Sequence, residues 1–279
     1  METTGMQSEL SLNTSQVQGI LVGFIRDEVH NTGLRHGIIG LSGGIDSTLS
    51  AFLTAQALGK ENVLGVIMPY RTSDPQSRAD AEMIVDTLGI RSEIVDISPM
   101  VDAYLSRYGD SGRVRSGNVM ARQRMIVLYD LSTREHGLVI GTSNKTETLL
   151  GYTTIYGDNA CAINPLGDLY KTQVWQLAEA VGVPKGIIEK LPSADLWTGQ
   201  TDEGELGFSY REVDRLLHYM IDERRTPEEL EQMGFAGEFI TSVREIIRRT
   251  QFKRRPPIIA KVSHRTVNLD FRYARDWGI

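Results

Sequence analysis

Residues 42–47 have the types and the order that could bind a phosphate group. They read Ser-Gly-Gly-Ile-Asp-Ser and lie between an apolar stretch at 38–41 and a helical stretch that runs to about Leu58. Glycine lets the backbone turn tightly and approach a ligand closely. The N–H groups at the start of the following helix, with the positive end of its dipole, favour an anion, and Ser42 and Ser47 add hydroxyl donors. The segment predicts an anion-binding turn, and a ligand-free turn with a helix cap is the alternative.

Asp46 is the residue of this segment that conflicts with anion binding. A carboxylate beside a phosphate group requires a cation, and Mg²⁺ would resolve the conflict by bridging Asp46 to phosphate oxygens. The segment is not a Walker A loop, because it lacks the Gly-Lys-Ser/Thr ending. It resembles instead the SGGxDS loop of the N-type ATP pyrophosphatases, which break ATP between its α- and β-phosphates.

The elements around this loop predict the edge of a sheet at which it must lie. Four apolar stretches indicate strands, at 38–41, 63–68, 92–97 and 138–140. Helical patterns lie between them, at 76–88 and 119–134, and another precedes them at 17–25. This alternation favours an α/β fold with a doubly wound parallel sheet. The polar loops after Leu41, Met68 and Ile140 should then meet at the carboxyl edge of the strands, where such sheets bind ligands.

The last third of the chain is predicted to be helical. A helix is expected at 171–181 and another at 237–251. Residues 209–212 form a capping-box pattern, and Pro227 follows Thr226 as at a helix start. We expect one domain over 1–279, with residues 1–14 as a flexible lead-in.

Composition excludes several classes of protein. The net charge is −6 over 279 residues, which argues against bulk nucleic-acid binding. Cys161 is the only cysteine, so an internal disulfide or a cysteine zinc cluster is impossible. The polar N-terminus is unlike a signal peptide, and no apolar run reaches the ~18 residues of a membrane span. We expect a cytoplasmic protein with neither a membrane nor a nucleic-acid partner.

Seven further segments narrow the resemblance from the N-type ATP pyrophosphatases to a single family among them. In chain order they are 117–125, 141–147, 156–158, 164–173, 192–196, 200–207 and 253–257. Together with 42–47 they resemble the NAD synthetases over nearly the whole chain. The resemblance implies a Rossmann-like fold of the adenine nucleotide alpha hydrolase type with a helical C-terminal part. It also implies ATP-dependent amidation of deamido-NAD to NAD, through an adenylated intermediate, with release of AMP and pyrophosphate.

The resemblance also implies residue roles. The ATP-binding residues would be Gly40, Leu41, Ser42, Gly43, Gly44, Ile45, Asp46, Ser47, Thr142, Lys171 and Ser193. Mg²⁺ would be bound by Asp46 and Glu147, and Lys171 would neutralise the departing pyrophosphate. Deamido-NAD would contact Arg122, Glu203 and Lys253. The alternative for the charged residues outside 42–47 is an ordinary solvated surface position.

Three positions depart from the family pattern. Some ammonia-dependent members carry a lysine at the position of Ile155, an aspartate at that of Ala162 and a histidine at that of Phe252. Ile155 and Ala162 cannot make charged contacts, so the contacts to the pyridine carboxylate are left unassigned.

The nitrogen donor is expected to be free ammonia. Glutamine-dependent members carry an extra amidase domain with a catalytic cysteine, and only 36 residues precede Gly37. Cys161 is interpreted as a small buried apolar residue. A separate glutaminase subunit remains an alternative, and the resemblance implies a homodimer.

Other functions fit the sequence less well. A tRNA-thiolating enzyme is disfavoured by the single cysteine and the acidic charge, and GMP or asparagine synthetases fit poorly from Gly141 onward. A catalytically silent nucleotide sensor would not need the set of Asp46, Glu147 and Lys171. Closure of loops at 109–117 and 195–207 over the site would exclude water from the adenylate.

Overall fold

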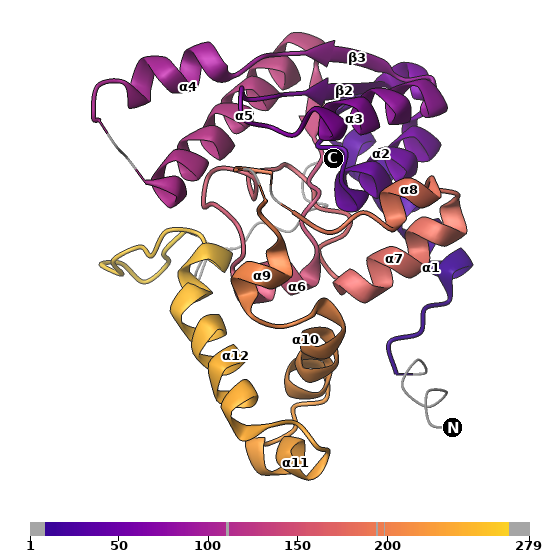
Figure 1. The fold of residues 1–279 in the computed structure, drawn as a ribbon. Coiled ribbons are helices and arrows are strands. Elements are labelled where there is room, and N and C mark those ends of the chain that lie inside the picture. The colour runs from indigo at the N-terminus through magenta and orange to yellow at the C-terminus, as the bar shows by residue number, and fades with distance from the viewer. Residues whose placement is uncertain (1–8, 110–111, 194, 198, 268–279) are drawn as a thin grey trace.

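The computed structural model describes residues 9–109, 112–193, 195–197 and 199–267. Within them, four parallel strands form one sheet in the order β3-β2-β1-β4 (Figure 1). Ile38 of β1 pairs with Leu64 on one side and Val139 on the other. The strands are β1 (His36–Gly40), β2 (Val63–Ile67), β3 (Arg91–Ile94) and β4 (Gly137–Val139). The four predicted strands are therefore confirmed, with bounds shifted by at most three residues.

Helices cover both faces of the sheet, which confirms the doubly wound arrangement. Neighbouring residues of β1 point to opposite faces, so Ile39 packs into one core and Ile38 into another. The core around Ile39 includes α1 (Thr14–Asn31), α2 (Ile45–Leu58), α3 (Pro75–Leu88) and α7 (Lys171–Val181). The core around Ile38 includes α4 (Ser98–Leu105) and α5 (Arg113–Glu135).

The strand order fixes where a ligand site can form. The chain runs outward from β1 through β2 to β3, then returns to place β4 on the other side of β1. The loops that leave β1 and β4 therefore lie side by side at the carboxyl edge, where parallel sheets of this kind bind ligands. The two segments that resemble ATP-binding motifs, 42–47 and 141–147, are the loops at this switch point.

The C-terminal helices build a third core below the sheet (Figure 1). They are α10 (Tyr210–Leu217), a π-helical turn at His218–Asp222, α11 (Pro227–Gln232) and α12 (Gly237–Thr250). Tyr170 and Trp175 join this core to α7. Shorter helices are α6 (Lys145–Leu150), α8 (Lys185–Ile188) and α9 (Asp202–Leu206). The predicted helical C-terminal part is confirmed.

Some elements differ from the prediction. Helices α4 and α6 were not predicted, because eight and six residues are too few to establish a helical period. Helix α5 begins at Arg113, earlier than the predicted 119, after Gly112 at φ 67°. Within the expected lead-in of residues 1–14, the described residues 9–13 contact the body of the protein: the Leu12 N–H donates to Gln176 at 3.0 Å.

No helix within the described part of the chain is long and apolar enough to cross a membrane.

Candidate active site

The loop after β1 is built as an anion cradle. Gly43 has φ 74°, a left-handed conformation that glycine adopts without strain. Gly44 is the N-cap of α2 and brings no side chain to cap it, so first-turn N–H groups can face a ligand. Ser42 and Ser47 brace the turn: their hydroxyl oxygens lie 3.0 Å apart, and the Gly44 N–H donates to Ser42 Oγ at 3.2 Å.

A second helix start carries Glu147 toward this loop. Asn144 and Glu147 form a capping box at α6, in which the Glu147 N–H donates to Asn144 Oδ1 at 2.9 Å. The Asn144 side chain also donates from Nδ2 to Asp46 Oδ1 at 3.0 Å. One fully buried amide therefore joins the loop after β4 to the first turn of α2. The prediction that the loops after β1 and β4 meet is confirmed.

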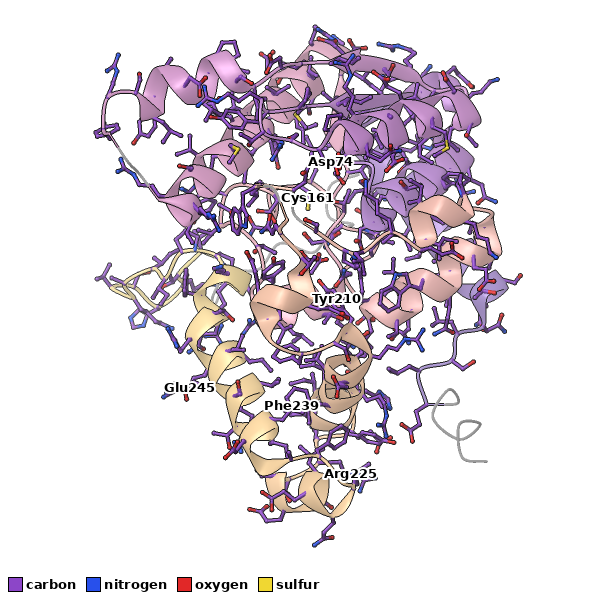
Figure 2. All side chains as sticks on the ribbon, in the orientation of Figure 1. Asp74, Cys161, Tyr210, Arg225, Phe239 and Glu245 are labelled. Carbon is purple, nitrogen blue, oxygen red and sulfur yellow. The ribbon has the colours of Figure 1, made fainter. Side chains whose placement is uncertain are left out.

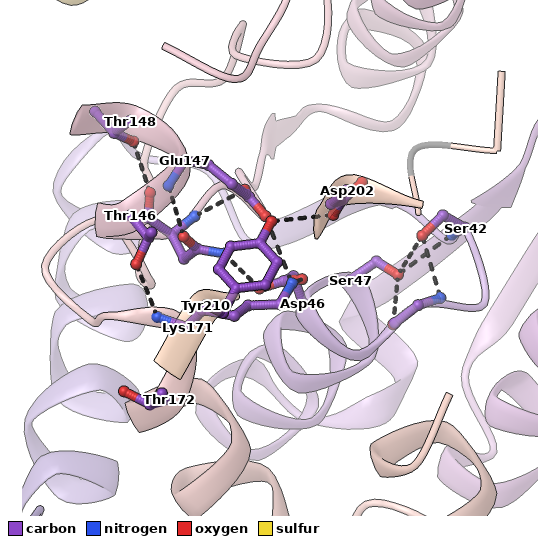
Figure 3. A network of polar contacts seen from close by, with 12 residues as sticks. Ser42, Asp46, Ser47, Thr146, Glu147, Thr148, Lys171, Thr172, Asp202 and Tyr210 are labelled. Carbon is purple, nitrogen blue, oxygen red and sulfur yellow. Dashed lines mark hydrogen bonds and ion pairs between the residues drawn. The ribbon is translucent and has the colours of Figure 1, made fainter. Parts of the chain in front are cut away.

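Lys171, the first residue of α7, lies between the two carboxylates (Figure 3). Its Nζ donates to Asp46 Oδ2, and it lies 3.5 Å from Glu147 Oε1. The Lys171 side chain is only 2% exposed and that of Glu147 15%, so neither is a solvated surface group. The structure therefore brings together the three residues expected to act in catalysis.

The cluster has more negative than positive charge. Burial, with repulsion from Asp46, raises the pKa of Glu147 to about 8. Burial alone would lower the pKa of Lys171, but attraction to Asp46 and Glu147 outweighs it and raises that pKa. Burial also raises the pKa of Asp202, which lies close enough to interact with both Asp46 and Lys171. Three carboxylates around one ammonium leave room for a further cation.

Asp214 of α10 fixes the helices that carry Lys171 and Glu147. It is completely buried and accepts from Thr146 Oγ1 at 2.6 Å and from the Thr172 N–H at 2.8 Å. The Lys171 N–H donates in turn to Thr146 Oγ1 at 3.0 Å. Burial raises the pKa of Asp214 to about 6. One carboxylate from the C-terminal part thus secures the first turns of α6 and α7.

Tyr210 of α10 closes the cluster from below (Figures 2 and 3). Its ring centroid lies 5.2 Å from Lys171 Nζ, and its hydroxyl donates to Asp202 Oδ2 at 3.0 Å. The Tyr210 N–H donates to Glu203 Oε1 at 2.8 Å. Glu203 lies in α9, and this bond ties α9 to α10, whereas the sequence predicted a loop over 195–207.

Three other residues expected at the site are Thr142, Ser193 and Lys253. Ser193 is exposed, and its Oγ accepts from the Asp195 N–H at 3.1 Å. Thr142 follows β4 and is half-buried. Lys253 donates from Nζ to the carbonyls of Gly151 and Thr153, at 2.7 and 2.6 Å.

Arg122 lies beside a separate cavity on α5. The cavity has a volume of about 540 Å³ and is lined by Arg113, Arg115 and Arg122 together with apolar and amide side chains. The Arg122 guanidinium donates to the Ile155 carbonyl at 3.3 Å. Three arginines around one hollow provide positive charge for an anionic ligand. The structure thus separates two groups of predicted residues, those of the carboxylate cluster and those near α5.

Sequence analysis missed Asn144, Asp202, Tyr210 and Asp214. Asn144 could have been found, since Asn144 with Glu147 three residues later is a helix N-terminus signature. The other three reach the cluster only because the C-terminal core packs α9 and α10 under α6 and α7, which no local pattern reveals. Cys161 is half-buried rather than fully buried, and burial raises the pKa of its thiol.

Comparison with known proteins points to one family. The sequence profile of the family described as NAD synthase matches residues 17–257. The NH(3)-dependent NAD(+) synthetase of Trichlorobacter lovleyi is 57% identical over 97% of this chain and 99% of its own length. A solved NH3-dependent NAD synthetase from Campylobacter jejuni, in complex with the nitrate ion, has TM-score 0.78 and 34% identity. That alignment covers 90% of this chain and 100% of the other. A structure of NMN synthetase from Francisella tularensis has TM-score 0.80 and 33% identity, over 90% and 99% of the two chains.

Proposed function

This chain belongs to the NAD synthase family, and from that premise we propose how it carries out its reaction. Its activity is that of an NH3-dependent NAD(+) synthetase. We propose that it adenylates the carboxylate of deamido-NAD with ATP and then converts the adenylate to NAD with ammonia. The observation that carries this proposal is the buried Lys171 between Asp46 and Glu147, beside the glycine-rich loop at the switch point of the sheet.

The cluster fits a divalent cation. Asp46 and Glu147 offer the carboxylate oxygens that Mg²⁺ prefers, and these two carboxyl groups share a single ammonium partner, Lys171. We propose that both residues bind Mg²⁺ together with ATP, where the ion would supply charge neutralisation for the triphosphate. Burial, and after it repulsion from Asp46, raises the pKa of Glu147, and a bound cation would favour its ionised form.

The first step requires pyrophosphate to leave ATP. A substrate carboxylate oxygen forms a bond to the α-phosphorus, and the bond from that phosphorus to the bridging oxygen of pyrophosphate breaks. The N–H groups of residues 42–47 and the start of α2 would bind the phosphates. Lys171 would then shift from its carboxylate partners toward the negative charge that develops on the leaving group.

The second step requires the adenylate to persist until ammonia arrives. Ammonia attacks the acyl carbon, the bond from that carbon to the AMP oxygen breaks, and a proton leaves the nitrogen. Because water would also attack the acyl carbon, we propose that 195–207 covers the site. Leu196 supports this role, since its Cδ1 lies 2.9 Å from the position that a Cβ on Gly117 of α5 would take.

We propose that deamido-NAD binds along α5, near Arg122 and the cavity beside it, with contributions from Glu203 and Lys253. The arginines there suit the pyrophosphate of a dinucleotide. The likeness to an NMN synthetase favours a second candidate substrate, the corresponding mononucleotide, which would be amidated to NMN by the same chemistry.

We also propose that the enzyme is a cytoplasmic homodimer. Apolar side chains lie exposed on α5, where Val114 is 73% and Ile126 51% exposed, and Tyr104 and Tyr108 lie exposed nearby. Clustered exposed apolar groups of this kind mark surfaces that another protein covers.

Product analysis tests the proposal. Purified protein is incubated with ATP, Mg²⁺ and deamido-NAD or the mononucleotide, with either ammonium or glutamine, and NAD, NMN and AMP are quantified. We expect NAD and AMP in equal amounts with ammonium, much less with glutamine, and none when EDTA replaces Mg²⁺. Activity should fall by about 10²-fold or more in Asp46→Ala and Glu147→Ala, as when other groups that stabilise developing charge are removed.

The outcomes separate the alternatives. Equal rates with glutamine would contradict ammonia as the direct donor. Faster amidation of the mononucleotide would favour the second candidate, and no amidation of either substrate would reject the proposed reaction.

A further inference from the structure

Lys190 contacts both helix α3 and residues 42–47, which are called the phosphate loop from here on. It follows α8, and its Nζ lies 2.6 Å from Asp80 Oδ2, 3.3 Å from Ser77 Oγ and 3.4 Å from the Gly43 carbonyl oxygen. A lysine ammonium has three N–H donors, and each here has an acceptor. The Lys190 side chain is 28% exposed and that of Asp80 12%, so the pair is largely shielded from water.

The position of the phosphate loop depends on the contacts of Lys190, because Gly43 of this loop packs directly against Ser77 of α3. A Cβ on Gly43 would lie 2.2 Å from the Ser77 carbonyl oxygen, which is too close for any side chain at this position. A shift of the first turns of α3 would therefore move Gly43 and the backbone N–H groups beside it. Asp80 is fixed within α3 by Gln76, whose Nε2 donates to Asp80 Oδ1 at 2.8 Å.

The same turns of α3 also receive the segment that carries Ser193. The Asp74 N–H, at the N-cap of α3, donates to Asp195 Oδ1 at 3.1 Å (Figure 2 labels Asp74). The Asp195 N–H donates to Ser193 Oγ at 3.1 Å. Lys190 and Asp195 thus attach both ends of the segment 190–195 to α3. Helix α3 is the common support of the two segments expected to contact ATP.

We propose that Lys190 and Asp80 are positioning residues for ATP, which align the phosphate loop with the segment that carries Ser193. They act through α3 and the Gly43 carbonyl rather than by contact with the nucleotide, because the three donors of Lys190 are already in use. The inference rests on the proposed function, in which ATP phosphates bind residues 42–47. It goes further by assigning a role to two residues that lie outside every segment of the family resemblance.

The alternative is that Lys190 leaves Asp80 and binds a phosphate directly. The two roles predict opposite effects of Asp80→Asn. If the pair positions the loop, loss of the carboxylate weakens ATP binding as loss of the lysine does. If Lys190 is a phosphate ligand restrained by Asp80, the same substitution frees it, and ATP binding is unchanged or tighter.

Binding and kinetics of four variants test the proposal: Lys190→Met, Lys190→Arg, Asp80→Asn and, as a matched control, Lys185→Met. Lys185 is an 88% exposed lysine of the neighbouring helix α8. Affinity for α,β-methylene-ATP with Mg²⁺ is measured by calorimetry, KM is measured separately for ATP and for deamido-NAD, and melting temperatures show whether each variant folds.

We expect Lys190→Met and Asp80→Asn each to weaken binding of the analogue and raise KM for ATP by about tenfold, since small misplacements of binding groups cost up to about 10²-fold. KM for deamido-NAD should stay within about twofold, Lys190→Arg should recover part of the loss, and Lys185→Met should match wild type. A merely structural role would lower the melting temperature and leave the KM for ATP unchanged.

Wild-type affinity in Lys190→Met would overturn the proposal, and so would unchanged or tighter binding in Asp80→Asn. Analogue binding does not require turnover. Failure of the proposed reaction, seen as no amidation by wild type, would therefore be distinguished from failure of this inference.

Discussion

At the scale of single residues, the site buries three ionisable side chains, Asp46, Glu147 and Lys171, next to one another. Burial makes it costly to keep Glu147 ionised, and repulsion from Asp46 adds to that cost, so the pKa of Glu147 rises to about 8. Lys171 offsets part of this cost. It is itself almost fully buried, and it lies at a helix start, where a positive charge is unfavourable. Such a cluster contributes little to stability, as expected if its groups have the binding role that we propose for them.

Two substitutions separate the roles of these residues. Glu147→Gln removes the repulsion between Asp46 and Glu147. The glutamine keeps the shape of the side chain and an oxygen that can accept from the Asn144 N–H. We expect kcat to fall by about 10²-fold or more, with a melting temperature in metal-free buffer equal to or above that of wild type. Lys171→Met leaves two buried carboxylates without their cation, so activity and stability should both fall, the latter by about 3–5 kcal/mol.

Thermal melts in EDTA and steady-state kinetics check this pair of predictions. Glu189→Gln, at a side chain that is 68% exposed, is the matched control and should change neither quantity. A Glu147→Gln variant as destabilised as Lys171→Met would show that Glu147 stabilises the fold, contrary to the charge balance described above.

At the scale of elements, sequence patterns predicted the segments whose function depends on local structure. The order of strands and helices predicted that the loops after Leu41 and Ile140 meet, and the resemblance to the NAD synthetases implied that Asp46, Glu147 and Lys171 act together there. Helix α10 is different. Its capping box predicts where it starts, but the contacts of Asp214 with Thr146 and Thr172 arise from tertiary packing across 68 and 42 residues of chain.

Asp214→Ala tests whether α10 supports the site. The substitution leaves the buried Thr146 hydroxyl and the Thr172 N–H without their acceptor, so we expect unfolding free energy to fall by about 2–4 kcal/mol. Glu212→Ala, on the same helix, removes only the exposed partner of the capping box and should cost about 1 kcal/mol or less. Urea unfolding measures both, and kcat should fall only in Asp214→Ala.

A loss in Asp214→Ala no greater than that in Glu212→Ala would mean that the first turns of α6 and α7 are fixed without α10. A loss of stability with unchanged kcat would mean that Asp214 supports the fold without positioning Lys171 or Glu147.

At the scale of the whole molecule, the sheet positions the loops that carry Asp46 and Glu147, and the C-terminal helices pack against the helices that follow them. The architecture followed from the alternation of strands and helices, and the strand order then explains why the loops after β1 and β4 meet. The roles of Arg122, Glu203 and Lys253 stay predictions. Their hydrogen bonds here are to backbone groups, and the residues that recognise the pyridine end are not evident where Ile155 and Ala162 replace charged residues.

The central claim is that the substrate carboxylate attacks the α-phosphorus of ATP. Deamido-NAD labelled with ¹⁸O in its carboxylate is turned over with ATP, Mg²⁺ and ammonium, and AMP, pyrophosphate and any inorganic phosphate are examined by mass spectrometry. The account predicts one labelled oxygen in each AMP and none in pyrophosphate. Label in inorganic phosphate with formation of ADP, or AMP without label, would contradict it.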